Sequence, residues 1–369
     1  DLAMKYMLNQ FIYKDGIAFP DEITSGKVKN MYDMVFNFDP SKVTDKSMCV
    51  NGVFYGLNTM DTPILFASVV GPAFRNKDCN YYLYMLDGTG LITAYSSQDT
   101  KYVLLVPTNE QIESEDIYLR TYADGSKLQQ ETEDGLVDVS SSVMRTIVNI
   151  HTATGVDGLK TNGTQVLATQ TGFNYWYVKD GKITSSAAYN KILEPDNNVE
   201  PFSEFTEVKN GNDNWNNGRT YMYSGTALFQ AQEGDGLQHK LSVCNDNRYV
   251  YYQFAQLLQK ADMVMSSNYI FGLAGASHVI GFIPTNEAIS TAIAAGQIPG
   301  MDATGAVTSS SKLRQYLLSY FIRDRENALI SYPYPGSAMK SSTYVTASGK
   351  SLTYTDSGSS LSIMVDGKV

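Results

Sequence analysis

The stretch HVIGFIPTNEAIS, residues 278–290, is an apolar run that breaks at Pro284 into Thr-Asn-Glu and then resumes as an apolar pattern. A second stretch, YVLLVPTNEQIE at residues 102–113, has the same order. Continuous β-branched and aromatic residues bounded by a breaker predict a short strand that is covered on both faces. Proline then ends the strand, because it has no backbone N–H to donate. We therefore expect one unit of structure that the chain uses at least twice.

The polar residues after each proline are typical of a helix start. Threonine suits the N-cap position, and glutamate in the first turn meets the positive end of the helix dipole. In the first copy Gln111 lies three residues after Thr108 and predicts a capping box, whereas the second copy has Ala288 at that place. The motif is therefore interpreted as a structural strand-to-helix corner, formed by Pro107, Thr108, Asn109 and Glu110 and again by Pro284, Thr285, Asn286 and Glu287.

Two further patterns recur along the chain. Residues 4–12, 143–151 and 314–322 carry apolar side chains three and four apart, which predicts a helix with one buried face. In this alignment His151 takes the position of Phe321, so we expect a partly buried structural histidine.

Asn-Gly is the second recurring pattern, in CVNGVFY at residues 49–55 and WNNGRTY at residues 215–221. This dipeptide predicts a tight hairpin turn. Glycine-punctuated runs rich in Thr, Tyr and Val predict further antiparallel strands at residues 343–369.

Composition narrows the classes of function. The 369 residues carry a net charge of −10, which argues against nucleic-acid partners because phosphate binding needs clustered cations. No apolar run reaches the roughly 18 residues that a membrane-spanning helix needs. Three scattered cysteines and three separated histidines predict no metal site, and no cofactor motif is present. Serine residues lack the Gly-x-Ser-x-Gly elbow of a hydrolase, so no catalytic residues are expected.

Together, FIPTNEAI, LVPTNEQI, the apolar helix and NGVFY resemble fasciclin domains, whose motifs have the forms TxFxPTNxAF, Tyr-His and NGxxHxID. The resemblance implies an α+β fold of tandem fasciclin-like domains, each a wedge of strands arranged as a sandwich or partly open barrel with a helical layer. It divides the chain into the C-terminal part of a first domain (1–72), a complete second domain with insertions (73–240), and the N-terminal and central part of a third (241–369). The Tyr-His pair reads Ile150-His151 and Tyr320-Phe321, so no role attached to that pair is carried over.

Fasciclin domains are adhesion and interaction modules, so the resemblance implies a non-enzymatic protein at the cell surface or outside the cell. Its partners would be other surface proteins or glycans. Long Asn-rich insertions are similar to those of surface proteins of Bacteroidota, which predicts a lipid anchor at the outer membrane if the source is bacterial.

The alternative is a glycan-binding accessory subunit of an outer-membrane nutrient-import complex, in which aromatic side chains stack on sugars. Strand alternation at residues 175–177 predicts that Trp176 faces one side and Tyr175 and Tyr177 the other. Trp215, in the polar loop GNDNWNNG, is expected to be the most exposed aromatic residue. These four residues are the candidate partner-binding or glycan-binding set.

Overall fold

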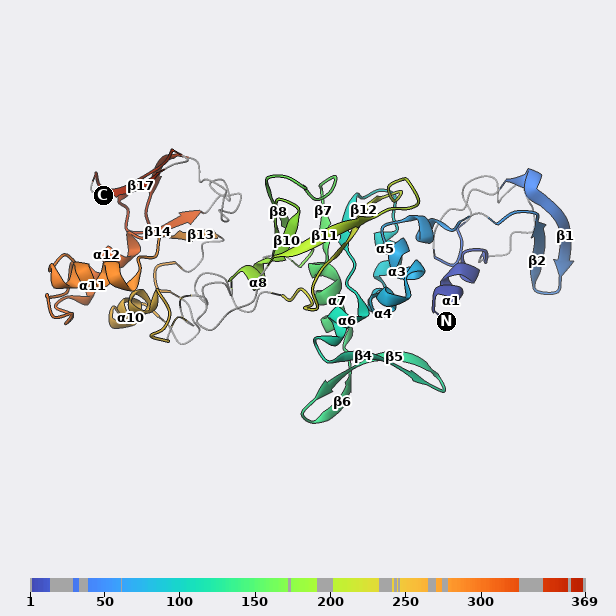
Figure 1. Cartoon of the computed structure of the whole chain (residues 1–369), viewed down its shortest axis with the longest axis horizontal. Coiled ribbons are helices and arrows are strands. Elements are labelled where there is room, and N and C mark those ends of the chain that lie inside the picture. The colour runs from blue at the N-terminus through green and yellow to red at the C-terminus, as the bar shows by residue number, and fades with distance from the viewer. Residues whose placement is uncertain are drawn as a thin grey trace.

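The computed structural model describes residues 2–13, 29–32, 39–60, 62–171, 174–190, 202–231, 241, 244, 246–264, 270–273, 278–324, 341–357 and 360–367. Along the chain, Figure 1 shows an N-terminal hairpin, a central region and a C-terminal region. The N-terminal elements are α1 (Leu2–Asn9), η1 (Pro40–Lys42), β1 (Val43–Cys49) and β2 (Gly52–Leu57).

The first half of the central region contains short helices, the strand and helix of the first corner, and a three-stranded meander followed by a helix. They are η2 (Ile64–Ala67), α3 (Gly71–Arg75), η3 (Lys77–Cys79), α4 (Asn80–Gly88), α5 (Leu91–Tyr95), β3 (Tyr102–Leu105), α6 (Asn109–Glu113), β4 (Ile117–Tyr122), β5 (Gly125–Thr132), β6 (Gly135–Asp138) and α7 (Ser141–Ile150). The remaining central elements are β7 (Thr152–Thr154), β8 (Thr164–Ala168), β9 (Tyr175–Lys179), β10 (Lys182–Ser185), α8 (Ser186–Asn190), β11 (Ser203–Val208) and β12 (Gly218–Tyr223).

The C-terminal region repeats part of this order. Its elements are α10 (Tyr252–Lys260), β13 (His278–Gly281), α11 (Asn286–Ala294), α12 (Ser310–Leu318), β14 (Phe321–Asp324), β15 (Ser342–Val345), β16 (Ser351–Asp356) and β17 (Leu361–Val365).

A seven-stranded sheet in the order β7-β3-β12-β11-β10-β9-β8 organises the central region. Strand β3 runs parallel to β12, and the other neighbours are antiparallel. A bridge from Ala153 to Thr169 joins the two ends of this order, so the sheet is nearly closed. The fold is therefore a mixture of a barrel-like sheet and helices, as the α+β expectation requires.

Strand β3 is buried on both faces, as its sequence predicts. Leu104 and Val106 lie in the apolar cluster that the helices share, whereas Val103 and Leu105 lie in a second cluster enclosed by the sheet. All four side chains are fully buried. The apolar run is continuous because alternate side chains pack into two different apolar clusters, one on each face of the strand.

The C-terminal strand β13 divides its side chains in the same way. Val279 and Ile283 pack against the helix cluster, and Ile280 and Phe282 belong to the cluster under β15–β17. Counted back from the proline of each corner, the same positions face the helices and the same positions face the sheet.

The apolar helices α7 and α12 also match. Ile147 and Val148 of α7 occupy the helix cluster of the central region, as Leu317 and Leu318 of α12 do in the C-terminal region. Each helix leads into a strand, β7 or β14, that pairs antiparallel with β3 or β13.

The pairing around the corner sets which residues of the two regions correspond. The Leu105 N–H donates to His151 O, and the Phe282 N–H donates to Tyr320 O. The structure therefore places Tyr320 at the position of His151, one residue before the Phe321 that the sequence alignment predicted.

Each Asn-Gly motif lies at a tight turn, but the glycine begins the returning strand, so the two turn residues are Val50-Asn51 and Asn216-Asn217 and not the predicted Asn-Gly pair. Cys49 lies opposite Gly52, and Trp215 opposite Gly218. The surroundings differ, because Asn51 is exposed while Asn217 is fully buried.

Asn217 uses its buried amide to fasten three segments. Its Nδ2 donates to Tyr95 O at 2.7 Å and to Ser97 O at 2.9 Å, and its Oδ1 accepts from the Val69 N–H at 2.9 Å. The second Asn-Gly turn therefore anchors the start of β12 to the loops around α3 and α5.

Packing continues across the predicted boundary at residue 72. Leu65, Val69 and Val70 are buried in the same cluster as Leu86 and Leu104. The predicted boundary at residue 240 lies outside the described residues. Both boundaries stay predictions.

Candidate interaction surface

The corner motif begins each helix with a threonine cap. Thr108 Oγ1 accepts from the Gln111 N–H at 3.3 Å, and Gln111 Oε1 accepts from the Thr108 N–H at 2.9 Å, which is the predicted capping box. Thr285 Oγ1 accepts from the Ala288 N–H at 3.4 Å without the reciprocal bond. Glu110 and Glu287 lie exposed in the first turns.

The asparagine of the motif has a role that the sequence did not reveal. Asn109 Oδ1 accepts from the Tyr81 N–H at 3.0 Å, and its Nδ2 donates to Lys77 O at 3.1 Å. These two backbone groups lie at the start of α4. The asparagine therefore fastens the corner to the preceding helix.

Asn286 makes the same pair of bonds in the C-terminal region. Its Oδ1 accepts from the Gln253 N–H at 2.8 Å, and its Nδ2 donates to Tyr249 O at 2.7 Å, at the start of α10. The N-cap residues Cys79 and Tyr251 make no side-chain cap, so each asparagine supplies it from a distant part of the chain. Poor N-caps before two apolar helices were the available signal in the sequence.

Trp215 is not the exposed aromatic residue that the sequence predicted. Its side chain is only 4% exposed, and its indole N–H donates to Val208 O at 2.6 Å. The ring lies against Gly71, and the Arg75 guanidinium sits 5.2 Å from the ring centroid. The polar sequence of the loop predicted exposure, but the loop folds back and packs its tryptophan against α3.

The strand set around Trp176 follows the predicted alternation. Trp176 is fully buried and donates from its indole N–H to Ile150 O at 2.8 Å, whereas Tyr175 and Tyr177 on the opposite face are half-buried. Tyr177 packs edge-on against Tyr189, with ring centroids 5.1 Å apart. The four candidate aromatics are therefore not brought together, and neither tryptophan offers a free face.

His151 is buried more deeply than predicted. Its Nδ1 lies 2.7 Å from Ile147 O and its Nε2 lies 3.0 Å from the Tyr223 hydroxyl. Burial lowers the pKa of His151 to about 4, so the ring is neutral near pH 7. It stacks on Tyr223 and Phe229, which makes it part of the core.

A cavity of about 400 Å³ opens between residues 157–161 and the strands β11 and β12. Two of its charged groups pair with each other, because Arg219 Nη1 lies 2.7 Å from Glu207 Oε1. The Tyr221 hydroxyl accepts from the Leu159 N–H at 3.1 Å. Within the described residues no group of three His, Cys, Asp or Glu side chains is placed to hold a metal ion. None of the described helices is long and apolar enough to cross a membrane.

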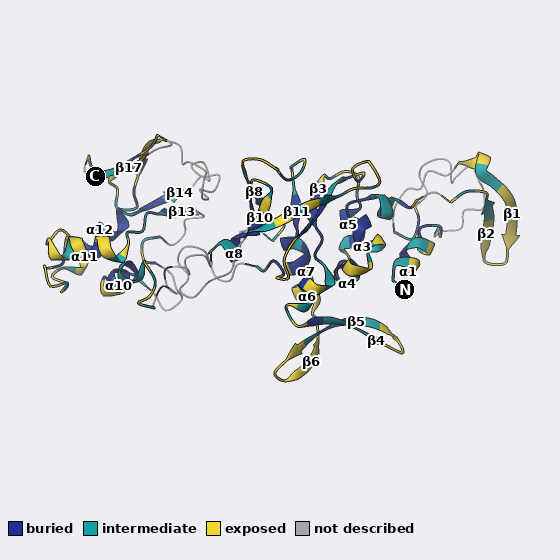
Figure 2. Cartoon of the chain, in the orientation of Figure 1, coloured by how far each residue is buried: buried dark blue, intermediate teal, exposed yellow. Residues whose placement is uncertain are grey.

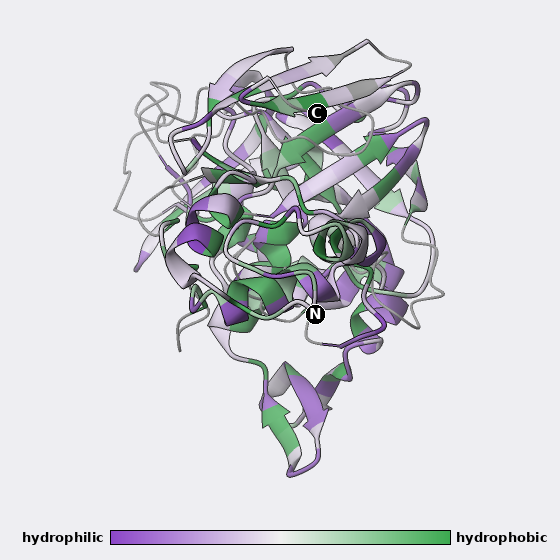
Figure 3. Ribbon diagram, turned by 90° about the vertical axis from the view of Figure 1, so that its left-hand side faces the viewer, coloured by the Kyte–Doolittle hydropathy of each residue, from purple (hydrophilic) through white to green (hydrophobic). Residues whose placement is uncertain are grey.

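Strands β4, β5 and β6 form an antiparallel meander, here called the arm, that projects from the central region (Figures 1 and 3). Only its root is buried, where Ile117 and Leu128 join the helix cluster. Most of the remaining arm is exposed (Figure 2), including the apolar side chains of Tyr122, Leu136 and Val137.

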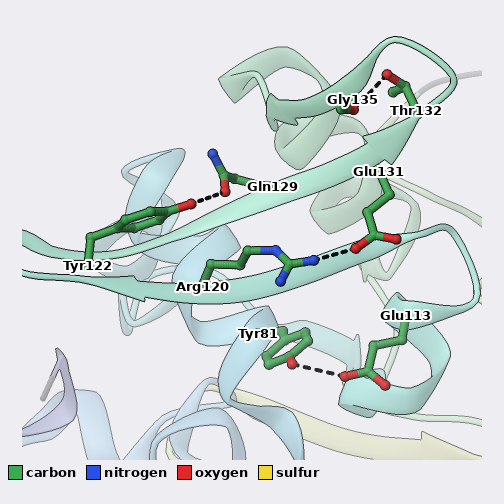
Figure 4. Close-up of polar contacts among 8 residues, drawn as sticks. All are labelled: Tyr81, Glu113, Arg120, Tyr122, Gln129, Glu131, Thr132 and Gly135. Carbon is green, nitrogen blue, oxygen red and sulfur yellow. Dashed lines mark hydrogen bonds and ion pairs between the residues drawn. The ribbon is translucent and has the colours of Figure 1, made fainter.

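The outward face of the arm carries a connected set of polar contacts (Figure 4). Arg120 pairs with Glu131 across β4 and β5, and Lys127 Nζ lies 2.9 Å from Asp138 Oδ2 across β5 and β6. The hydrogen bond from Lys127 lowers the pKa of Asp138 and raises that of its own ammonium.

Tyrosines and a glutamine complete this face. The Tyr122 hydroxyl donates to Gln129 Oε1 at 2.5 Å, and Gln129 Nε2 donates to Asp138 Oδ1 at 2.6 Å. Lys127 Nζ lies 5.2 Å from the centroid of the Tyr122 ring, and the Arg120 guanidinium 5.6 Å from that of Tyr118. The contacts cross all three strands, so they fix the shape of the face.

The arm was missed by the sequence analysis. Asp124-Gly125 and Asp134-Gly135 are hairpin-turn dipeptides between alternating runs, and the structure has a two-residue turn directly before each glycine, at Ala123-Asp124 and Glu133-Asp134. The acidic residues around them had been interpreted only as a solvated surface. The dipeptides were the signal that could have predicted the arm.

No protein-family model matches the sequence, and no curated protein matches it. Among solved structures, one that is similar is a FAS1 domain pair from the insect cell adhesion molecule fasciclin I. That likeness covers 78% of this chain and 88% of the other, at 11% sequence identity and a TM-score of 0.27.

Proposed function

We propose that this chain is a non-enzymatic interaction protein made of tandem fasciclin-like modules, and that the arm is its main contact surface for a protein partner. The motif resemblance and the repeated corner support the modular part. The observation that carries the functional part is the arm itself, an ordered sheet that projects from the body with polar and apolar side chains exposed.

Stability alone does not account for the arm. A small sheet without a core is marginal in water, and solvent screens surface ion pairs such as Lys127–Asp138, so they add little stability. The contacts hold the strands in one shape, which lowers the ordering cost of binding.

The chemistry of the arm favours a protein over a sugar. Tyr122, Leu136 and Val137 provide exposed apolar area beside charged groups, the combination that interface cores and rims show. The outer edge of β6 pairs with no other described strand, so its backbone can add a further strand. Glycan capture has less support, because Trp176 and Trp215 are both buried and neither ring can stack on a sugar.

The proposal places the protein outside the cell or at its surface, lipid-anchored at the outer membrane if it is bacterial, with other surface proteins as partners. Linked modules suit contacts of modest affinity, because the second contact gains effective concentration. Its support is the fasciclin-like motif set and the acidic composition.

The C-terminal region supplies the matched replacement for a test. Residues 295–309 connect α11 to α12 and contain an isolated bridge, Met301 to Val307, but no strand. A chain in which this loop replaces residues 114–140 keeps both helices and loses the arm.

Beads coated with the full chain are tested for attachment to a panel of immobilised extracellular proteins and polysaccharides. We expect attachment to a protein that is lost in the loop-swapped chain and weakened at least tenfold in Leu136→Asp, whose near-ultraviolet circular dichroism should match that of the wild type. Equal attachment by the loop-swapped chain, attachment to polysaccharide alone, or no attachment at all would contradict the proposal.

A further inference from the structure

The connection from β7 to β8 lies at one end of the nearly closed central sheet. Strands β3 and β12 begin at this end and β7 stops there, since Tyr102 lies opposite both Gly218 and Thr154. Residues 157–161 of the connection, here called the mouth loop, line the cavity of about 400 Å³ together with side chains of β11 and β12. The mouth of a barrel is a common place for a small-molecule site, and such sites usually measure about 300–1,000 Å³.

The mouth loop is an ordered wall of this cavity. Gln165 binds it through both ends of its amide, because Nε2 donates to Gly158 O at 3.1 Å and Oε1 accepts from the Lys160 N–H at 3.0 Å. The Leu159 N–H donates to the Tyr221 hydroxyl, and the Leu159 side chain is buried in the cluster that the sheet encloses. The cavity is therefore formed before any ligand arrives, which lowers the ordering cost of binding.

Gly158 allows the loop to lie directly against β12. Its φ is +151°, and an added Cβ would lie 2.6 Å from the Tyr221 hydroxyl oxygen and 2.7 Å from Arg219 Cδ. Only glycine tolerates both this backbone conformation and this close approach. The sequence therefore places a loop backbone, and no side chain, beside the polar ends of Arg219 and Tyr221.

Polar groups of β11 and β12 face the cavity at the edge of an apolar core. Arg219 and Glu207 are partly exposed and bonded to each other, and Glu207 lies opposite Tyr221 in the strand pairing. A guanidinium has several N–H donors and a carboxylate has several acceptor positions, so the pair keeps both kinds of group for a ligand. Burial raises the pKa of Tyr221, so its hydroxyl keeps a proton that it can donate.

The charges of the lining cancel. Arg219 and Lys160 are positive, whereas Glu207 and Asp157 are negative. A balanced lining favours a neutral ligand, because an anion or a cation meets a like charge in the same cavity.

The cavity also has an aromatic wall. The half-buried Phe205 packs edge-on against Tyr221, with ring centroids 5.5 Å apart, and lines the cavity beside the charged pair. A matching ligand therefore has hydroxyl groups on one side and C–H groups on another.

We propose that this cavity binds one neutral sugar ring, with two adjacent hydroxyls on the Arg219–Glu207 pair and C–H groups of the ring against Phe205. Each sugar hydroxyl both donates and accepts, and the bonded pair offers a donor and an acceptor side by side. The Tyr221 hydroxyl donates to a further sugar oxygen. The ring is a free monosaccharide or the end residue of a glycan. A cavity of this kind needs no stacking surface on Trp176 or Trp215.

Ligand-observed NMR of the full chain tests the proposal with D-glucose, D-galactose, D-mannose and N-acetyl-D-glucosamine as neutral probes and D-glucuronate as the charged probe. We expect at least one neutral probe to bind, with a dissociation constant on the order of 1 mM. D-Glucuronate should bind at least tenfold more weakly. Equal affinity for the neutral sugar and for its disaccharide indicates a free monosaccharide as the ligand, and tighter binding of the disaccharide indicates the end of a glycan.

Substitutions in the cavity test the assigned contacts. Arg219→Lys keeps the charge but loses the planar set of donors, and Glu207→Gln keeps the shape but loses the charge. Each should weaken binding at least tenfold, with urea unfolding by tryptophan fluorescence as the check of folding. Glu204→Gln makes the same change at an exposed position of β11 and should bind as the wild type does.

A measurement on the wild-type chain does not depend on the folding of a variant. The bound sugar should slow hydrogen exchange in residues 157–161 and not in the loop at residues 295–309. No binding by any neutral probe, tighter binding of D-glucuronate, unchanged binding in both cavity variants, or protection that avoids the mouth loop would overturn the proposal. Leu136→Asp on the arm should leave sugar binding intact, so this inference and the proposed contact of the arm fail independently.

Discussion

The central region and the C-terminal region share a corner and differ in what surrounds it. In both, a strand covered on two faces turns into a threonine-capped helix, and an asparagine binds the start of the preceding helix. Among the described residues, the arm and the strands β11 and β12 belong to the central region alone. The comparison shows that the motif determines the junction between sheet and helix. The arm, which we propose as the contact surface, is a separate addition between the two helices that follow β3.

The two Asn-Gly turns give the largest expected difference. Gly218 has φ of +147°, and an added Cβ would lie 1.9 Å from Tyr102 O, whereas one added at Gly52 meets nothing within 4 Å. We expect Gly218→Ala to lower the free energy of unfolding by about 3 kcal/mol or more. Gly52→Ala should change it by less than about 0.5 kcal/mol.

Tryptophan fluorescence during urea unfolding measures this difference in the central region, because Trp176 and Trp215 are the only tryptophans of the chain. Equal effects of the two substitutions would break the distinction between a buried and a free turn.

His151 and its counterpart Tyr320 give the next difference, in pH dependence. The folded pKa of His151 is about 4 and its ordinary value is 6.5, so the unfolded chain binds the proton more readily between these values. The free energy of unfolding should therefore fall by about 3 kcal/mol as the pH drops from about 6.5 to 4, over and above other groups.

His151→Phe, which puts a ring that does not titrate at this position, should remove this part of the acid loss. Urea midpoints followed by tryptophan fluorescence at several pH values check it. Profiles of wild type and variant that stay parallel from pH 7 to pH 4 would rule out the buried neutral histidine as their cause.

Features set by neighbouring residues could be predicted from the sequence. The buried strand at 103–106 and the capping box of Thr108 depend on local preferences and are present. A turn also forms at each Asn-Gly motif, one residue earlier than predicted. The burial of Trp215 and the contacts of Asn109 depend on segments far away in the chain. A polar loop and a polar side chain gave no indication of those contacts. The arm had a local signal in its Asp-Gly turns, but its projection from the body is a matter of tertiary packing.

The asparagines of the two corners give a smaller and more local effect. Asn109→Ala leaves the Tyr81 N–H without its acceptor, and Asn286→Ala does the same to the Gln253 N–H. Each substitution should cost about 1–3 kcal/mol, because a partly buried donor is left unpaired.

Native-state hydrogen exchange at Tyr81 and Gln253 in these two variants tests most directly whether both regions use one corner. The account predicts that Asn109→Ala accelerates exchange at Tyr81 and not at Gln253, and that Asn286→Ala does the reverse to a similar extent. Unchanged protection at either amide, or acceleration at both amides in either variant, would contradict it.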